Sequence, residues 1–256
     1  MLLAVDVGNT HMVIGVFENN SLRCHWRVKT DKSNTVDELA SLFHGLFIME
    51  NILFEEISSV IISSVVPVMQ AAWSEFATRY LKTTPLVVGH NVETGIKVCI
   101  DNPREVGADR IVNAVAAYAE FKTALIIVDF GTAITWDCVS AKGEYLGGII
   151  APGLSISMEA LAGRTAKLPQ VDISTPPSKA IGTNTVAAIK SGILFGYGAM
   201  VDGLIKRIRK ELTPDIPLTI ATGGMARLIA PYADAIDHVD PMLTLKGLRI
   251  LHERNR

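Results

Sequence analysis

The chain has 256 residues, of which 49% are hydrophobic, enough for a substantial core in one large or two smaller domains. Its formal net charge of −2, with no long basic run, argues against a nucleic-acid partner. Three widely spaced cysteines without a Cys-x-x-Cys pair are typical of a reduced, cytoplasmic protein. No basic leader and no apolar run of about 18 residues is found, so we expect neither export nor membrane insertion.

The first ten residues predict a strand that ends in a polar turn. Leu2–Val5 are apolar, Asp6-x-Gly-Asn-Thr10 follows, and His11–Phe17 predicts a second strand. Gly8 permits a ligand to approach the backbone closely, its neighbours offer N–H groups and hydroxyls, and Asp6 can hold a hydrated cation. The turn therefore suits a phosphate tail with its metal ion. An ordinary tight turn built from Gly and Asn fits the same residues equally well.

Strands and helices then alternate, which predicts an α/β fold. We expect strands at 22–28, 59–64 and 85–89 and helices at 36–49 and 71–80, the first of them capped by Thr35. Met12, Met49 and Met69 lie among apolar residues and are expected in the core.

A helical pattern begins at Asp109, directly after the small residues Gly107 and Ala108. Asp109 can be a helix cap or first-turn acid, which is a structural role. The small residues before it could admit a ligand, and Arg110 directly after it could bind an anion, so a functional role is the alternative.

The chain repeats its opening at 124–139, where an apolar strand leads into Asp129-x-Gly-Thr132-Ala. Aligning Asp6 with Asp129 also aligns Gly8 with Gly131. The repeat predicts two related α/β domains, 1–115 and 116–256, facing each other with both loops directed into one cleft. Chance repetition of an ordinary hairpin is the alternative.

The second half also contains a long apolar helix, about 186–205, whose glycines suit close packing within the domain or across a dimer. A strand at 218–222 ends in Thr222-Gly-Gly224, which suits backbone contact with a nucleotide. A final helix is expected at 241–251.

These motifs resemble a known superfamily. Asp6-x-Gly-Asn-Thr10, Asp129-x-Gly-Thr132-Ala and Thr222-Gly-Gly224 are similar to the phosphate and adenosine elements of actin-like kinases, which have ribonuclease H-like domains, each with a central mixed sheet. The run Asn102–Arg110, with Gly147–Gly153 and Gly182–Thr185, resembles the type III pantothenate kinases. The resemblance covers essentially the whole chain, in order.

The resemblance implies ATP-dependent phosphorylation of pantothenate, the first step of coenzyme A biosynthesis, by a homodimer. It implies that Asp109 is the general base, that Asp6 holds Mg²⁺ through water and that Asp129 binds a monovalent cation, K⁺ or NH₄⁺. The implied ATP contacts are Asp6, Val7, Gly8, Asn9, Thr10, His11, Met12, Val13, Gly131 and Thr132. The implied pantothenate contacts are Ile100, Asn102, Gly107, Ala108, Asp109, Arg110, Asn184 and Thr185, the last two reaching the neighbouring subunit's substrate.

One position departs from the family pattern, because many members carry an aromatic residue where this chain has Ile100. We expect altered packing or affinity there rather than lost activity. Another actin-like phosphotransferase, a polyphosphate-type hydrolase and a nucleotide-binding regulatory protein remain alternatives. The scattered histidines argue against a zinc site.

Overall fold

The computed structural model describes residues 1–256 and divides them into two compact units. The first unit comprises Met1–Lys97, Asp101–Ala116 and Leu243–Arg256, and the second comprises Val98–Ile100 and Ala117–Met242. The sequence predicted a domain boundary after residue 115, which lies close to the end of the segment Asp101–Ala116. It also assigned the last helix to the second domain, whereas Leu243–Arg256 belongs to the first unit.

The first unit is built on a five-stranded mixed sheet in the order β3-β2-β1-β4-β5. Its strands are β1 (Leu2–Val7), β2 (His11–Glu18), β3 (Ser21–Lys29), β4 (Ser59–Ser64) and β5 (Leu86–Val87). β1 is antiparallel to β2 and parallel to β4, with Val7 paired to both Met12 and Ser64. The carboxyl ends of β1 and β4 therefore meet at one edge of the sheet.

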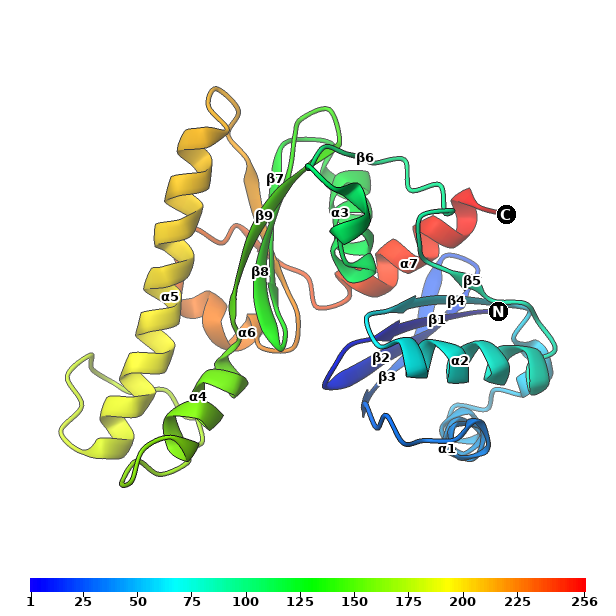
Figure 1. Cartoon of the computed structure of the whole chain (residues 1–256), viewed down its shortest axis with the longest axis horizontal. Helices are drawn as coiled ribbons and strands as arrows, with labels where there is room; N and C mark the ends of the chain where they lie inside the picture. Colours follow the sequence, from blue (N-terminus) through cyan, green and yellow to red (C-terminus); the bar gives the residue numbers. More distant parts are fainter. The chain divides into compact units, whose positions relative to one another are not determined.

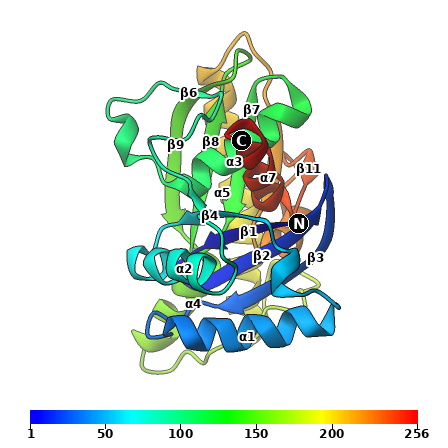
Figure 2. The ribbon, with the colours of Figure 1, turned by 90° about the vertical axis from the view of Figure 1, so that its right-hand side faces the viewer.

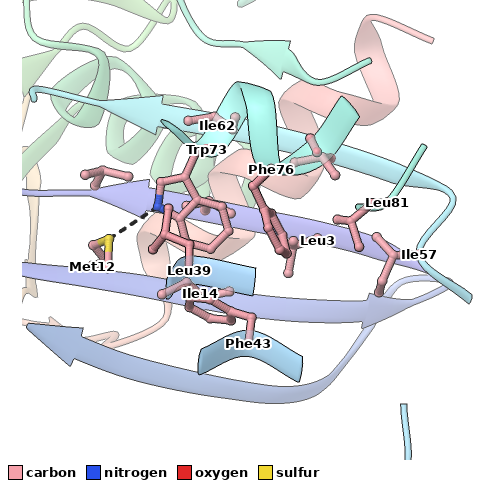
Figure 3. Close-up of a cluster of buried hydrophobic side chains, with 14 of the residues drawn as sticks. Leu3, Met12, Ile14, Leu39, Phe43, Ile57, Ile62, Trp73, Phe76 and Leu81 are labelled. Atoms are coloured by element: carbon pink, nitrogen blue, oxygen red, sulfur yellow. Dashed lines mark hydrogen bonds between the residues drawn. The ribbon is translucent and has the colours of Figure 1, made fainter. Parts of the chain in front are cut away.

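Helices cover both faces of this sheet, α1 (Val36–Met49) and α2 (Pro67–Arg79) on one and α7 (Leu243–Arg254) on the other (Figure 2). The α1–α2 side holds a dry aromatic core, in which the rings of Phe43 and Trp73 lie 4.8 Å apart (Figure 3). α1 starts with a capping box, since Thr35 Oγ1 accepts the Glu38 N–H and Glu38 Oε2 accepts the Thr35 N–H.

The second unit repeats this topology, which confirms two related α/β halves. Its sheet runs β11-β10-β7-β8-β9-β6, so β9-β8-β7-β10-β11 reproduces the order of the first sheet. The strands are β6 (Lys97–Val98), β7 (Leu125–Phe130), β8 (Ala133–Val139), β9 (Glu144–Pro152), β10 (Leu218–Thr222) and β11 (His238–Val239). The repeated Asp-x-Gly hairpin thus lies at the same place in both sheets.

The remaining helices are α3 (Ala108–Phe121), α4 (Leu154–Gly163), α5 (Thr185–Glu211) and α6 (Ala226–Ile229), with 3₁₀ turns at Phe54–Glu56, Pro103–Glu105 and Ala230–Tyr232. α5 runs along the β7–β9 sheet, and Leu194, Val201 and Ile205 pack into its core (Figure 1). By length and composition α5 could also cross a membrane, a criterion that core helices of globular proteins meet as well. The expected absence of a membrane partner stays a prediction.

Most predicted elements are observed, with local differences. α2 begins at Pro67 rather than near residue 71, because proline fits the first turn of a helix, where its missing N–H is not needed. Met12 and Met69 are buried as expected, but the prediction for Met49 is wrong. Met49 is the last residue of α1 and is 76% exposed. Phe47, two residues earlier, is buried, and two residues correspond to about 200° around the helix, so Met49 lies on the opposite, exposed face.

Candidate functional site

The first candidate element is the loop between β1 and β2, residues 8–10. The N–H of Gly8 donates to the carbonyl of His11 at 3.1 Å and closes the turn. A Cβ at position 8 would lie 3.0 Å from that carbonyl, so the tight turn favours glycine. Asn9 and Thr10 are exposed at the tip. The loop thus presents main-chain donors and small polar side chains to a ligand.

The residues that flank this loop divide between two faces. Val7 and Met12 point into the core, where Met12 Sδ accepts a hydrogen bond from Trp73 Nε1 at 3.3 Å (Figure 3). Asp6 pairs with Val13 and lies on the opposite face with it. Of the predicted ATP contacts, Val7 and Met12 can therefore meet a ligand only through their main chain.

Asp109 lies in the first turn of α3, and its Oδ1 accepts the N–H of Arg110 at 2.8 Å. Burial raises the pKa of this carboxyl above its usual value, and the Arg110 N–H and guanidinium oppose that rise. A Cβ at position 107 would lie 2.5 Å from Asp109 Oδ1, so glycine leaves room for the carboxylate. The site therefore holds a partly desolvated carboxylate whose pKa is raised toward neutral pH.

The structure brings Asp109 and the first loop to the same edge of the first unit. Val65, which follows β4, donates its N–H to the carbonyl of Val7 at 3.1 Å. The same residue borders Gly107, because its Cγ1 would lie 3.9 Å from a Cβ there. One residue thus touches both the end of β1 and the turn that carries Asp109.

Asn102 has a structural task in the segment before Asp109. Its Oδ1 accepts the N–H of Arg104, and its Nδ2 donates to Glu105 Oε1 at 2.8 Å. Both polar ends of the side chain therefore shape the 3₁₀ turn. Ile100 belongs to the second unit, where its Cγ2 lies near Gly147. A substrate role for Asn102 and Ile100 stays a prediction.

The second loop, Gly131–Thr132, lies between β7 and β8 and is bordered by two glycines distant in the sequence. Gly131 donates its N–H to the carbonyl of Ala133 at 3.0 Å, and Gly153 donates to the carbonyl of Thr132 at 3.0 Å. A Cβ at Gly223, which has a φ of +91°, would overlap Asp129 Oδ1. Main chain at Gly153 therefore borders the exposed second loop, and main chain at Gly223 borders the Asp129 carboxylate.

Asn184 and Thr185 lie at the start of α5. Asn184 is the helix cap, with its Oδ1 accepting the N–H of Ala187 at 2.8 Å. Both residues are exposed, so capping leaves them accessible. The structure shows the capping role, and the contact with a neighbouring subunit's substrate stays a prediction.

Comparison with known proteins decides the family. The model of the family described as type III pantothenate kinase matches residues 2–207. Proteins named type III pantothenate kinase from Geobacter sp. (strain M21) and Exiguobacterium sp. are 52% and 49% identical to the chain, over all of both chains in each case. The chain belongs to the type III pantothenate kinase family.

Membership in the type III pantothenate kinase family confirms the resemblance found in the sequence and makes the chain a kinase, with ATP implied as co-substrate. Solved structures agree on the actin-like fold. A proposed Baf family transcriptional activator from Campylobacter jejuni aligns with a TM-score of 0.58 at 18% identity, covering 99% of this chain and 98% of its own. The ROK hexokinase from Thermus thermophilus aligns with 0.52 at 13% identity, covering 98% and 97%.

Sequence reasoning missed part of what holds the two loops of this type III pantothenate kinase. Thr30 lies just after β3 and hydrogen-bonds to the first loop, but no motif marks it. Val65 is equally unmarked, since it reads as one more apolar residue after a strand. Gly153 and Gly223 belong to glycine-rich turns that the sequence shows. The sequence does not show that these turns border the second hairpin.

Proposed function

We propose that the chain transfers the γ-phosphoryl group of ATP to the primary hydroxyl of pantothenate, giving 4′-phosphopantothenate in the first step of coenzyme A biosynthesis. The observation that carries the proposal is the carboxylate of Asp109, which lies at the same sheet edge as the Gly8–Thr10 loop. Family membership supplies the substrate class, and this geometry supplies the chemistry.

In this proposal the first loop binds the ATP phosphates. Main-chain N–H groups at a glycine turn are suited to phosphate oxygens, and a side chain at position 8 would crowd the turn. Asp6 is separated from the loop by Val7 alone and offers carboxylate oxygens, which fit a hydrated Mg²⁺. Bound Mg²⁺ would offset negative charge on the phosphates.

Asp109 is proposed as the general base that accepts the hydroxyl proton of pantothenate. A base works best when its pKa approaches the working pH, and burial displaces the pKa of Asp109 in that direction. Phosphoryl transfer otherwise needs positioning and charge stabilisation rather than covalent chemistry by the protein. Arg110 adjoins the base and can pair with the pantothenate carboxylate or with charge on the transferring group.

The second loop is proposed to hold the monovalent cation. Asp129 offers carboxylate oxygens, and its Oδ1 lies beside the main chain of Gly131 and of Gly223, which follows β10. Oxygen donors suit hard cations such as K⁺. A bound K⁺ would supply positive charge at this loop, and Thr132, in the same loop, is a proposed ATP contact.

We propose that the kinase is a homodimer that packs through α5. Ala188, Gly192, Gly196, Ala199 and Gly203 are exposed and follow one another at intervals of three or four residues. A Cβ at Gly192, Gly196 or Gly203 would meet no atom within 4 Å, so this face leaves room for a second backbone. Asn184 and Thr185, at the start of the same helix, could then reach the neighbouring subunit's pantothenate. We expect the dimer in the cytoplasm.

An ATP-to-ADP coupled assay tests the function, with and without pantothenate, in potassium and in sodium buffers. Pantothenate-dependent ADP release that requires potassium is the expected result. Hydrolysis of ATP without pantothenate would replace the proposal with a hydrolase. ATP binding without turnover in either buffer would replace it with a regulatory protein.

A further inference from the structure

The carbonyl groups of the first loop are held from behind by the residue that follows β3. Thr30 donates its Oγ1–H to the carbonyl of Gly8 at 2.7 Å and its main-chain N–H to the carbonyl of Thr10 at 2.9 Å. The side chain of Thr30 is buried, with 7% of its surface exposed. At the base of the loop, the carbonyl of His11 in β2 accepts the Gly8 N–H. The carbonyls of Gly8 and Thr10 are therefore turned toward protein.

This bonding pattern matters for a loop that must bind phosphate. A carbonyl oxygen directed at a phosphate would repel it, whereas an N–H would bind it. Because a peptide unit holds its N–H and C=O on opposite sides, fixing the carbonyls inward directs the neighbouring N–H groups outward. Thr30 thus sets which side of the loop peptides faces a ligand.

A second bond from β3 fixes the ring of His11. Arg27 Nη2 lies 3.2 Å from His11 Nδ1, and a guanidinium can only donate. His11 Nδ1 must therefore accept, so the neutral ring carries its proton on Nε2. Burial, with the charges of Arg27 and Lys29, also lowers the pKa of His11 below its usual value, which keeps the ring neutral.

The strand register places this pair beside the loop. Arg27 pairs with Val13, and Val13 pairs with Asp6, so these side chains lie in one row on one face of the sheet. Adjacent strands lie about 4.8 Å apart, which puts the Cα atoms of Arg27 and Asp6 about 10 Å apart. His11 lies on the same face as this row, two residues along β2, next to the loop.

We infer that the end of β3 is a second part of the phosphate site, in which Thr30 and Arg27 are positioning residues. Thr30 orients the loop N–H groups, and Arg27 holds His11 as the tautomer whose Nε2–H donates to a phosphate oxygen of the nucleotide. This inference rests on the proposed binding of ATP phosphates by the Gly8–Thr10 loop.

Nucleotide binding by Thr30→Val and Thr30→Ser tests the first half. Valine keeps the shape and removes the donor, so we expect the dissociation constant for ATP to rise about tenfold while the KM for pantothenate is unchanged, the usual effect of one lost hydrogen bond. Serine keeps the hydroxyl and should stay within about twofold of wild type. Thr94→Val is the matched control, because Thr94 Oγ1 makes a similar bond to the carbonyl of Ile96. Equal ATP affinity in Thr30→Val and wild type, or equal losses in Thr30→Val and Thr94→Val, would overturn the role of Thr30.

The second half is tested at the ring nitrogens of His11. Nitrogen NMR of the labelled full-length protein should show an unprotonated Nδ1 in wild type and a mixture of tautomers in Arg27→Leu. Glutamine can place an N–H near the position of Nε2 and asparagine cannot, so His11→Gln should retain ATP affinity and His11→Asn should lose about tenfold. A protonated Nδ1 in wild type, or equal affinities for the two variants, would contradict the inference.

Gly8→Val separates this inference from the proposed function. Weakened ATP binding in Gly8→Val with normal binding in Thr30→Val would remove only the role of β3. Normal ATP binding in Gly8→Val would show that the loop is not the phosphate site and would overturn both.

Discussion

The two Asp-x-Gly hairpins start from the same sequence pattern and occupy the same place in two sheets of the same order. In both, the residue that follows the third strand, Thr30 or Gly153, donates its main-chain N–H to the loop. Thr30 adds a side-chain bond that Gly153 cannot make, because its Oγ1–H also donates to the carbonyl of Gly8. The second hairpin differs in having Gly223, after β10, whose main chain closely approaches Asp129. We propose that the first arrangement directs N–H donors toward an anion and that the second holds a cation through the Asp129 carboxylate. The Asp-x-Gly motif thus specifies the hairpin, and residues distant in the sequence, Thr30 and Gly223, determine which ligand we propose for each loop.

The largest effect should come from the carboxylate beside the first loop. Asp109→Asn removes the proposed base with little change in shape, so we expect kcat to fall about 10²–10⁴-fold while ATP binding is retained. Steady-state kinetics with an ATP-binding measurement checks this. Near-normal turnover would remove Asp109 from the chemistry.

Asp129→Ala tests the second hairpin. Removal of the carboxylate should weaken potassium activation about 10–100-fold, because the cation loses a charged ligand. Activity measured against potassium concentration gives the readout. A variant that keeps the wild-type potassium response would show that the second hairpin does not hold the cation.

Gly223→Ala tests the close approach of the main chain to Asp129, which distinguishes the second hairpin from the first. The positive φ and the overlap with Asp129 Oδ1 predict a loss of about 1–3 kcal/mol in the free energy of unfolding. Gly45→Ala is the control, since a Cβ there meets no atom within 4 Å and a helix interior favours alanine. Denaturant unfolding compares the two. Equal stabilities would show that the close approach at Gly223 is not required.

The smallest effect is expected at the start of α5. Asn184→Ala removes a helix cap and should cost about 1 kcal/mol, whereas Asn184→Ser keeps a capping oxygen. A rise in the pantothenate KM in both variants would support substrate contact in addition to capping. A KM unchanged in both would leave Asn184 as a cap alone.

Short sequence patterns were enough to predict most of the fold. Thr35 with Glu38 marked the start of α1, and the repeated Asp-x-Gly turn marked two related sheets, because capping and turn formation depend on residues close in sequence. The pairing of α7 with the first unit was missed, since periodicity reveals an apolar face but not its partner.

In the candidate site, too, residues in short motifs could be predicted and contacts between distant residues could not. Asp109 and the Gly8 loop carry recognisable residues, so the sequence predicted both. The contact of Thr30 with Gly8 joins residues about 20 positions apart through strand register, which no short motif encodes. Val65 connects the two elements only because β1 and β4 are parallel and end together.

The pH dependence of pantothenate phosphorylation tests the central claim most directly. The base must be unprotonated, and burial raises the pKa of Asp109, so kcat/KM should fall with decreasing pH at a value above the usual aspartate pKa of about 3.9. Asp109→Asn should have a much lower rate without this acid limb. An identical acid limb in the variant, or a wild-type rate that stays flat down to acid unfolding, would contradict the assignment of Asp109 as the base.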